Sequence, residues 1–97
     1  MDSILQTERE CFITGARQGL HKHHIFFGNP LRKISEANGF WCWLRWDWHN
    51  GANYGVHQNR ALDLDLKRCC QREYEKTHSR KEFVQLIGKN YLEDTEC

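Results

Sequence analysis

The sequence predicts an α+β fold: a small domain in which an antiparallel hairpin is followed by a helix, with an additional helix toward the C-terminus. Two stretches predict the hairpin, because residues 20–27 end in a β-branched and aromatic run and residues 40–49 alternate with a period of two. From residue 59 onward the apolar spacing changes to about 3.6, the period of an α-helix. A chain of 97 residues is expected to form one domain with a small core.

The first strand is predicted at residues 20–27, with the sequence LHKHHIFF, before a Gly-Asn-Pro turn. Neighbouring side chains such as His23 and His24 point to opposite faces of a flat strand, so they share one site only where the strand twists or bulges. Ahead of this strand, residues 1–10 are mostly polar and are expected to form a frayed start or a short arm. Residues 11–19 are expected to form a short hairpin or loop.

The second strand is predicted at residues 40–49, with the sequence FWCWLRWDWH. Residues 28–39, which begin and end in turn residues, are expected to form a surface loop with one helical turn. The alternation of the second strand assigns Phe40, Cys42, Leu44, Trp46 and Trp48 to one face, and Trp41, Trp43, Arg45, Asp47 and His49 to the other. The tryptophans are expected to pack in the core and hairpin rather than to form a base-stacking platform.

The long helix is predicted from about Asn59 or Arg60 to about Lys76, with Asn59 as its N-cap. Asp63 and Lys67 have the spacing of an exposed ion pair on a helix. The apolar face is expected to carry Leu62, Leu66, Cys69, Cys70 and Tyr74.

The final helix is predicted by a capping box of Ser79 and Glu82 at its start and by Gly88 just after its end. Its apolar stripe is expected to contain Phe83, Leu86 and Ile87. Tyr91 and Leu92 are expected to dock against the domain, and residues 93–97 to be frayed.

The composition excludes several classes of protein. The net charge of +1 gives no general attraction to nucleic acid, so any such contact must depend on local clusters of Arg and Lys. The five cysteines are odd in number and form no CxxC pair, and neither a signal peptide nor an apolar run of membrane-spanning length is found. We therefore expect a reduced, cytoplasmic protein without disulfides and without a membrane segment.

Four of the six histidines are expected to meet at one place. They are His23 and His24 near the end of the first strand, His49 at the end of the second, and His57 shortly before the long helix. In a hairpin followed by a helix these positions converge, and imidazole is a common ligand of divalent metals. The sequence therefore predicts a metal site, while His21 and His78 are expected to be solvated or structural.

Three motifs, KHHIFFG, LRWDWHN and GVHQN, carry a family resemblance. With them the chain resembles the HNH nucleases, also called His-Me finger or ββα-metal nucleases, and in particular their small phage-type members. The resemblance spans roughly residues 11–92. It implies a single HNH-like domain over residues 1–97, built as a ββα-metal finger with an additional C-terminal helix.

The resemblance also implies roles for individual residues. His24 matches the general base and His23 the first metal ligand. His49 and His57 match further ligands of one divalent ion, which would be Mg²⁺, Mn²⁺ or Zn²⁺. Asn38 matches the residue that orients the base, and the alternatives for that role are Asn50 and Asn59.

The chain departs from the family pattern in two ways. Many members bind a structural zinc with two CxxC knuckles, and here Arg45 and Trp48 occupy the positions of the second knuckle, so aromatic packing has to replace the zinc. In addition, His49 and His57 are eight residues apart, farther than is usual in the family. Both can reach one ion only if the loop between them folds back.

The activity implied by the resemblance is that of an endonuclease or nickase, which hydrolyses phosphodiester bonds in DNA with the help of a metal ion. The expected substrate is double-stranded DNA. In this reaction neutral His24 takes a proton from the attacking water, and the ion stabilises the charge on the phosphate and the leaving oxygen. Arg32, Lys33 and Arg60 are expected to contact the DNA phosphates. Such an enzyme would act in the cytoplasm, and in the host cytoplasm if it is encoded by a phage.

Two other classes of function remain open from the sequence. In the first, the chain is a non-catalytic, zinc-stabilised finger of phage origin that binds DNA or protein, and His23, His49 and His57 belong to a closed structural site. In the second, it is a phage accessory protein that binds a host defence or recombination protein through exposed aromatic side chains. Structural zinc sites have four protein ligands, whereas catalytic sites keep one position open, so the number of ligands distinguishes the enzyme from the finger.

Overall fold

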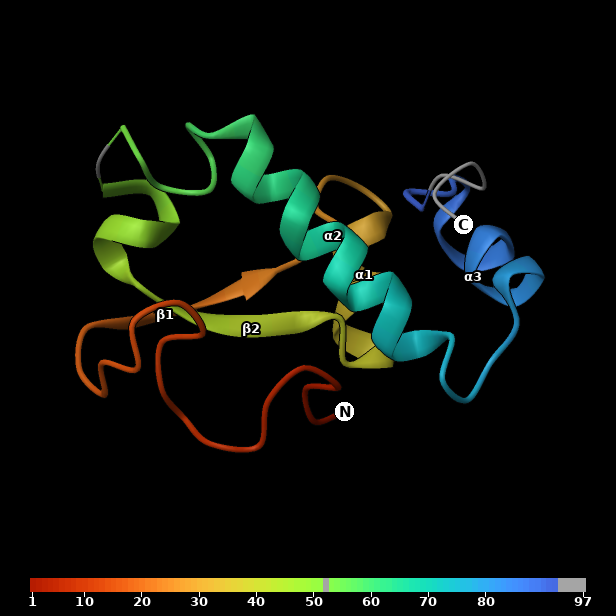
Figure 1. Ribbon diagram of the computed structural model, residues 1–97, viewed down its shortest axis with the longest axis horizontal. Coiled ribbons are helices and arrows are strands. Elements are labelled where there is room, and N and C mark those ends of the chain that lie inside the picture. Colours follow the sequence, from red (N-terminus) through yellow and green to blue (C-terminus); the bar gives the residue numbers. More distant parts are fainter. Residues whose placement is uncertain (52, 93–97) are drawn as a thin grey trace.

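The computed structural model describes residues 1–51 and 53–92, and the predicted frayed segment 93–97 lies outside these residues. The described elements are β1 (Leu20–His24), α1 (Leu31–Asn38), β2 (Trp41–Arg45), the π-helical turn η1 (Asp47–Gly51), α2 (Arg60–Tyr74) and α3 (Arg80–Ile87), shown in Figure 1. The α+β class is confirmed, with a two-stranded antiparallel sheet and helices. Within the described ranges, no helix is long and apolar enough to cross a membrane.

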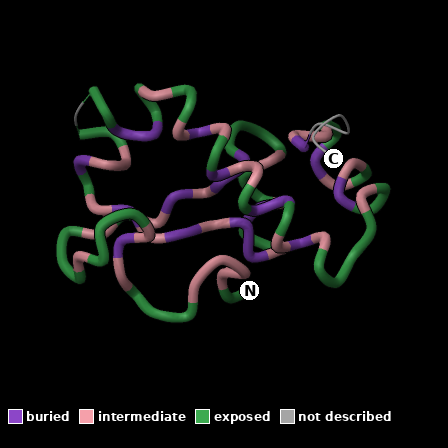
Figure 2. The backbone as a smooth tube through the Cα atoms, in the orientation of Figure 1, coloured by how far each residue is buried: buried purple, intermediate pink, exposed green. Residues whose placement is uncertain are grey.

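The core is built on one face of this sheet. β1 and β2 pair so that His23 lies opposite Cys42 and His24 opposite Trp41. Figure 2 shows buried residues along both strands and on the inner sides of the helices. The predicted alternation is confirmed for the first part of β2, and the largest buried apolar side chains are Ile25, Phe26, Phe40, Leu44 and Phe83. The rings of Phe26 and Phe83 lie 5.5 Å apart between centroids, so α3 packs against the segment that follows β1.

β2 is shorter than predicted, because it ends at Arg45 instead of His49. Two residues later, Asp47 is only 6% exposed and lies close to Arg45, with an Nε–Oδ1 distance of 2.6 Å. The hydroxyl of Tyr54 donates to the same carboxylate. These contacts bury Asp47 and turn the chain into η1, so the alternation fails beyond Leu44. Trp46 consequently points outward and is 52% exposed, contrary to its predicted place on the buried face.

The segment 28–39 is a helix, not the predicted loop, because α1 covers eight of its residues. Its only fully buried member is polar: the hydroxyl of Ser35 donates to the carbonyl of Phe26 and accepts from the amide of the same residue. The helix ends at Gly39, which adopts the left-handed conformation with a φ of 75°. α1 is therefore held against the segment that follows β1 by the hydrogen bonds of Ser35 together with the partly buried Leu31 and Ile34, which pack against the core.

The N-terminal segment 1–10 is bound to the sheet, as a short arm rather than a frayed start. The hydroxyl of Ser3 donates to the carbonyl of Trp41, and the side-chain oxygen of Gln6 accepts from the amide of Trp43. Further along, the amide of Phe12 donates to the carbonyl of Trp43, without forming a strand. The segment runs along the outer edge of β2 (Figure 1).

The two C-terminal helices agree closely with the sequence. Asn59 caps α2 by accepting from the amide of Leu62, and α3 has the predicted capping box and a left-handed Gly88 at its end. Two details differ. Cys69, predicted on the apolar face, is exposed, while Gln71 is buried and hydrogen-bonded to Asn90. The predicted ion pair of Asp63 and Lys67 is formed, but it is not exposed as predicted, because Asp63 is only 7% exposed.

Candidate metal centre

Three histidines from different parts of the chain converge beside the sheet. They are His23 on β1, His49 in η1 and His57 in the loop before α2, and one ring nitrogen of each lies within 4.8 Å of the others. The Nε2 atoms of His49 and His57 are 3.1 Å apart. Two nitrogens bound to one tetrahedral zinc at the usual bond length lie about 3.4 Å apart, so the spacing fits a shared ion.

The local backbone explains why His49 and His57 meet despite their separation in sequence. η1 places the His49 ring beside His21 and His23 of β1, with ring centroids 5.2 and 5.3 Å away. The amide of Val56 donates to the carbonyl of Trp48 at 2.7 Å, and the amide of His57 donates to the carbonyl of His49 at 3.2 Å. The two ends of the loop between His49 and His57 therefore lie side by side, as a shared metal ion requires.

His23 is the buried member of the cluster. It is 1% exposed, and its Nε2 is one of two buried side-chain polar atoms without a hydrogen-bond partner among the described residues. Burial, followed by repulsion from His49 and His57, lowers its pKa to about 3. Burial also lowers the pKa of His49 to about 4. Both imidazoles are thus neutral near pH 7, the form that binds a metal, and the unpartnered Nε2 of His23 fits a ligand atom.

His21 also lies next to this cluster, although it was expected to be solvated or structural. Its Nδ1 lies 3.0 Å from the Nδ1 of His49, on the side of the ring opposite to His57. A second ring nitrogen held in this way orients a metal-binding histidine and fixes its tautomer. The alternation of side chains along β1 could have predicted this neighbour, because His21 and His23 lie on the same face of the strand.

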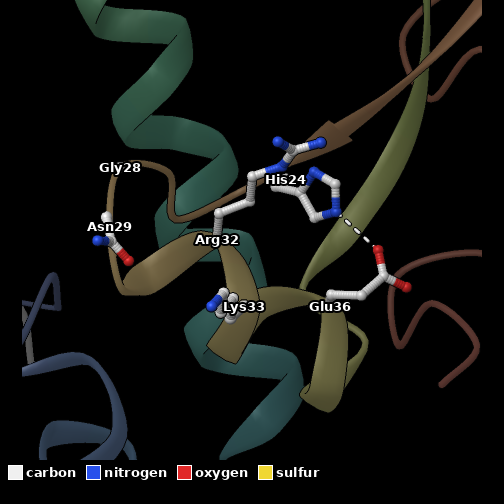
Figure 3. A pocket seen from close by; sticks show the side chains of 6 residues that line it. All are labelled: His24, Gly28, Asn29, Arg32, Lys33 and Glu36. Atoms are coloured by element: carbon white, nitrogen blue, oxygen red, sulfur yellow. Dashed lines mark hydrogen bonds and ion pairs between the residues drawn. The ribbon is translucent and has the colours of Figure 1, made fainter.

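His24 lies on the other face of β1 but borders the same space. A pocket of about 170 Å³ is lined by Lys22, His23, His24, Phe27, Arg32, His49 and His57. The Nε2 of His24 is 2.7 Å from Oε1 of Glu36 on α1, a partner that was not predicted from the sequence. Arg32 and His24 also line a second, larger pocket of about 560 Å³, drawn in Figure 3 with Lys33 and Glu36.

The remaining predicted site residues are divided between two places. Lys33 lines the larger pocket, and Arg60, the first residue of α2, lines a groove together with His57. Asn38 lies elsewhere: its amide donates to the carbonyl of Ile34 in its own helix, and it lines a pocket with Tyr74. The expected contact between Asn38 and His24 is therefore not formed. Of the alternatives, Asn59 uses its side chain as the cap of α2.

Comparison of the chain with protein-family models, with curated proteins and with solved structures finds no match. The class of protein is thus defined by the fold and the site alone: a small α+β domain in which three histidines lie close enough to bind one metal ion. Its functional assignment has to follow from the chemistry of that cluster and of the side chains around it.

Proposed function

We propose that the protein is a metal-dependent endonuclease or nickase that hydrolyses phosphodiester bonds in DNA, with His24 as the general base. The observation that carries this proposal is the shared pocket, in which the three clustered imidazoles, His24 and Arg32 border one space. A bound ion, a base and a cation that can hold a phosphate are the parts that such hydrolysis needs.

The number of ligands favours an enzyme over a structural zinc finger. In the described part of the chain the cluster contains three candidate ligands, His23, His49 and His57. Three protein ligands leave a coordination position open for water or substrate, whereas a structural site uses four. An all-imidazole set of ligands also favours Zn²⁺ over Mg²⁺, which prefers oxygen ligands.

The protein side chains divide the work of the reaction. His23, His49 and His57 hold the ion, which when bound supplies Lewis-acid stabilisation of the phosphate and of the leaving oxygen. His24 takes the proton of the attacking water. Arg32, at the boundary of the two pockets, holds the scissile phosphate, and Lys33 holds a neighbouring one.

The test is a plasmid-nicking assay with Zn²⁺, Mn²⁺ and Mg²⁺, comparing wild type with His24→Ala. The variant is expected to bind metal in calorimetric titration as wild type does, but to lose at least about 100-fold in cleavage rate, the contribution of a general base. His78→Ala, a histidine on the surface outside the pocket, is the matched control and should cleave normally. Wild type that cleaves DNA with none of these ions, or a fully active His24→Ala, would show the proposal to be wrong.

A further inference from the structure

Glu36 and His24 form a pair that the proposed reaction does not yet use. Glu36 projects from α1 toward the end of β1, and its Oε1 lies 2.7 Å from Nε2 of His24 (Figure 3). The distance is that of a short, charge-assisted hydrogen bond. The His24 side chain is only 12% exposed, while that of Glu36 is 48% exposed, so the imidazole is the more buried partner of the pair.

Lys22 fixes the other oxygen of the same carboxylate. Its Nζ lies 2.9 Å from Oε2 of Glu36, and it also lies 4.1 Å from the centre of the Trp41 ring. The hydrogen bond with His24, followed by that with Lys22, lowers the pKa of Glu36 to about 2. The carboxylate is therefore ionised at neutral pH, and each of its oxygens already has one donor.

An ionised carboxylate can only accept hydrogen bonds, so the ring nitrogen that faces it must carry the proton. In neutral His24 this nitrogen is Nε2, and the lone pair is left on Nδ1. Figure 3 shows the second ring nitrogen of His24 turned away from Glu36, on the side of the ring where the guanidinium of Arg32 lies. Nδ1 thus faces the side on which the proposed phosphate ligand Arg32 is placed.

We infer that Glu36 is a positioning residue for His24: its carboxylate, held by Lys22, keeps the imidazole in the Nε2–H tautomer and leaves Nδ1 as the atom that accepts a proton. The catalytic part of this inference rests on the proposed function. The tautomer itself does not, because it is a property of the free protein and can be measured without metal or DNA.

The variant Glu36→Gln tests the inference, because the glutamine amide has only one oxygen for the two groups, Lys22 and His24, that each contact one oxygen of Glu36. The ammonium of Lys22 is a donor only and takes that oxygen. The NH₂ group is then left facing Nε2 of His24, and this nitrogen can accept only if it is unprotonated. Glu36→Gln should therefore convert His24 to the Nδ1–H tautomer. Adding Lys22→Met to Glu36→Gln frees the amide to turn its oxygen to His24, and the double variant should recover the Nε2–H tautomer.

The tautomer is read from the ¹⁵N chemical shifts of the imidazole in the metal-free protein at about pH 8, where an ordinary histidine is neutral. Wild type and Lys22→Met should both show the proton on Nε2. Glu73→Gln is the matched control: Glu73, near the end of α2, forms a similar ion pair with Lys76 just beyond that helix, and its replacement should leave His24 unchanged. The inference is overturned if wild type has the proton on Nδ1 or on both nitrogens, or if Glu36→Gln keeps the wild-type tautomer.

Cleavage kinetics then separate positioning from folding. Glu36→Gln should lower kcat by about 10- to 100-fold, the usual effect of removing a partner that orients a functional histidine, with KM unchanged. The double variant should regain most of the lost kcat, which a loss of structure would not allow. If the tautomers behave as expected but wild type cleaves no DNA, the proposed function fails and the positioning of His24 by Glu36 stands.

Discussion

Acid should destabilise the metal-free protein through His23, and the size of the effect follows from its burial. The pKa of His23 is lowered from 6.5 to about 3 in the folded state, because a charged imidazole cannot be hydrated there. Between these two values the unfolded chain takes up a proton that the folded chain does not. Stability is therefore complete above about pH 6.5 and is lost as the pH falls toward 3, at about 1.4 kcal/mol per pH unit.

At pH 5 this linkage should remove about 2 kcal/mol of the free energy of unfolding, a large part of the 5–15 kcal/mol typical of a domain. The side chain is 1% exposed, so solvent does not weaken the effect. The assay is urea unfolding at pH 7 and pH 5 in EDTA, followed by tryptophan fluorescence. Staying at pH 5 or above avoids most of the titration of carboxylates such as Glu36.

His23→Gln supplies the comparison, because it has no group that titrates in this range. The variant should lose about 2 kcal/mol less than wild type between pH 7 and pH 5, because the proton that only the unfolded chain takes up at His23 is absent from it. Equal losses in the two proteins would refute the reasoning, since they would show that His23 takes up its proton without unfolding. A wild-type stability that is flat over this range would refute it as well.

Three further predictions concern metal binding and the backbone. Zn²⁺ at about 100 times its dissociation constant should raise the free energy of unfolding by about 2.7 kcal/mol, reversibly with EDTA, and His49→Ala or His57→Ala should abolish the gain seen in thermal melts. Asn59→Ala should cost about 1 kcal/mol in urea unfolding because α2 loses its cap; an unchanged midpoint would contradict the bond to Leu62. Gly39→Ala should cost about 2 kcal/mol or more, because φ is 75° there and the new Cβ would collide with the backbone of Asp2; wild-type stability would show that this contact yields easily.

The parts of the fold that could be predicted are those set by local sequence. The cap of α2 at Asn59 and the capping box at Ser79 and Glu82 depend on residues within one helical turn, and both are confirmed. α1 could not be predicted in the same way. Its buried residue is Ser35, which is polar, and the hydrogen bonds that hold it go to Phe26, a residue nine positions away.

The candidate site could likewise be predicted only in part. That His23, His49 and His57 lie together is confirmed, because strand ends and the loop before a helix converge in this topology. The partner of His24 was not predictable, since Glu36 reaches it from an element that the sequence did not reveal. The end of β2 was missed for a related reason: the buried Asp47 depends on Tyr54, which comes later in the chain.

The N-terminal segment covers the edge of β2 that another copy of the protein could otherwise pair with. A strand with an unpaired edge recruits another strand, and two-stranded sheets are especially exposed to this. Here Ser3, Gln6 and Phe12 occupy polar backbone groups of Trp41 and Trp43 on the outer edge of β2. The first 12 residues therefore block the pairing of this edge with a strand of another copy, and so prevent edge-to-edge polymerisation. Trimming them, or pulling them away with a fused tag, should cost the protein its solubility at high concentration before it disturbs the histidine cluster.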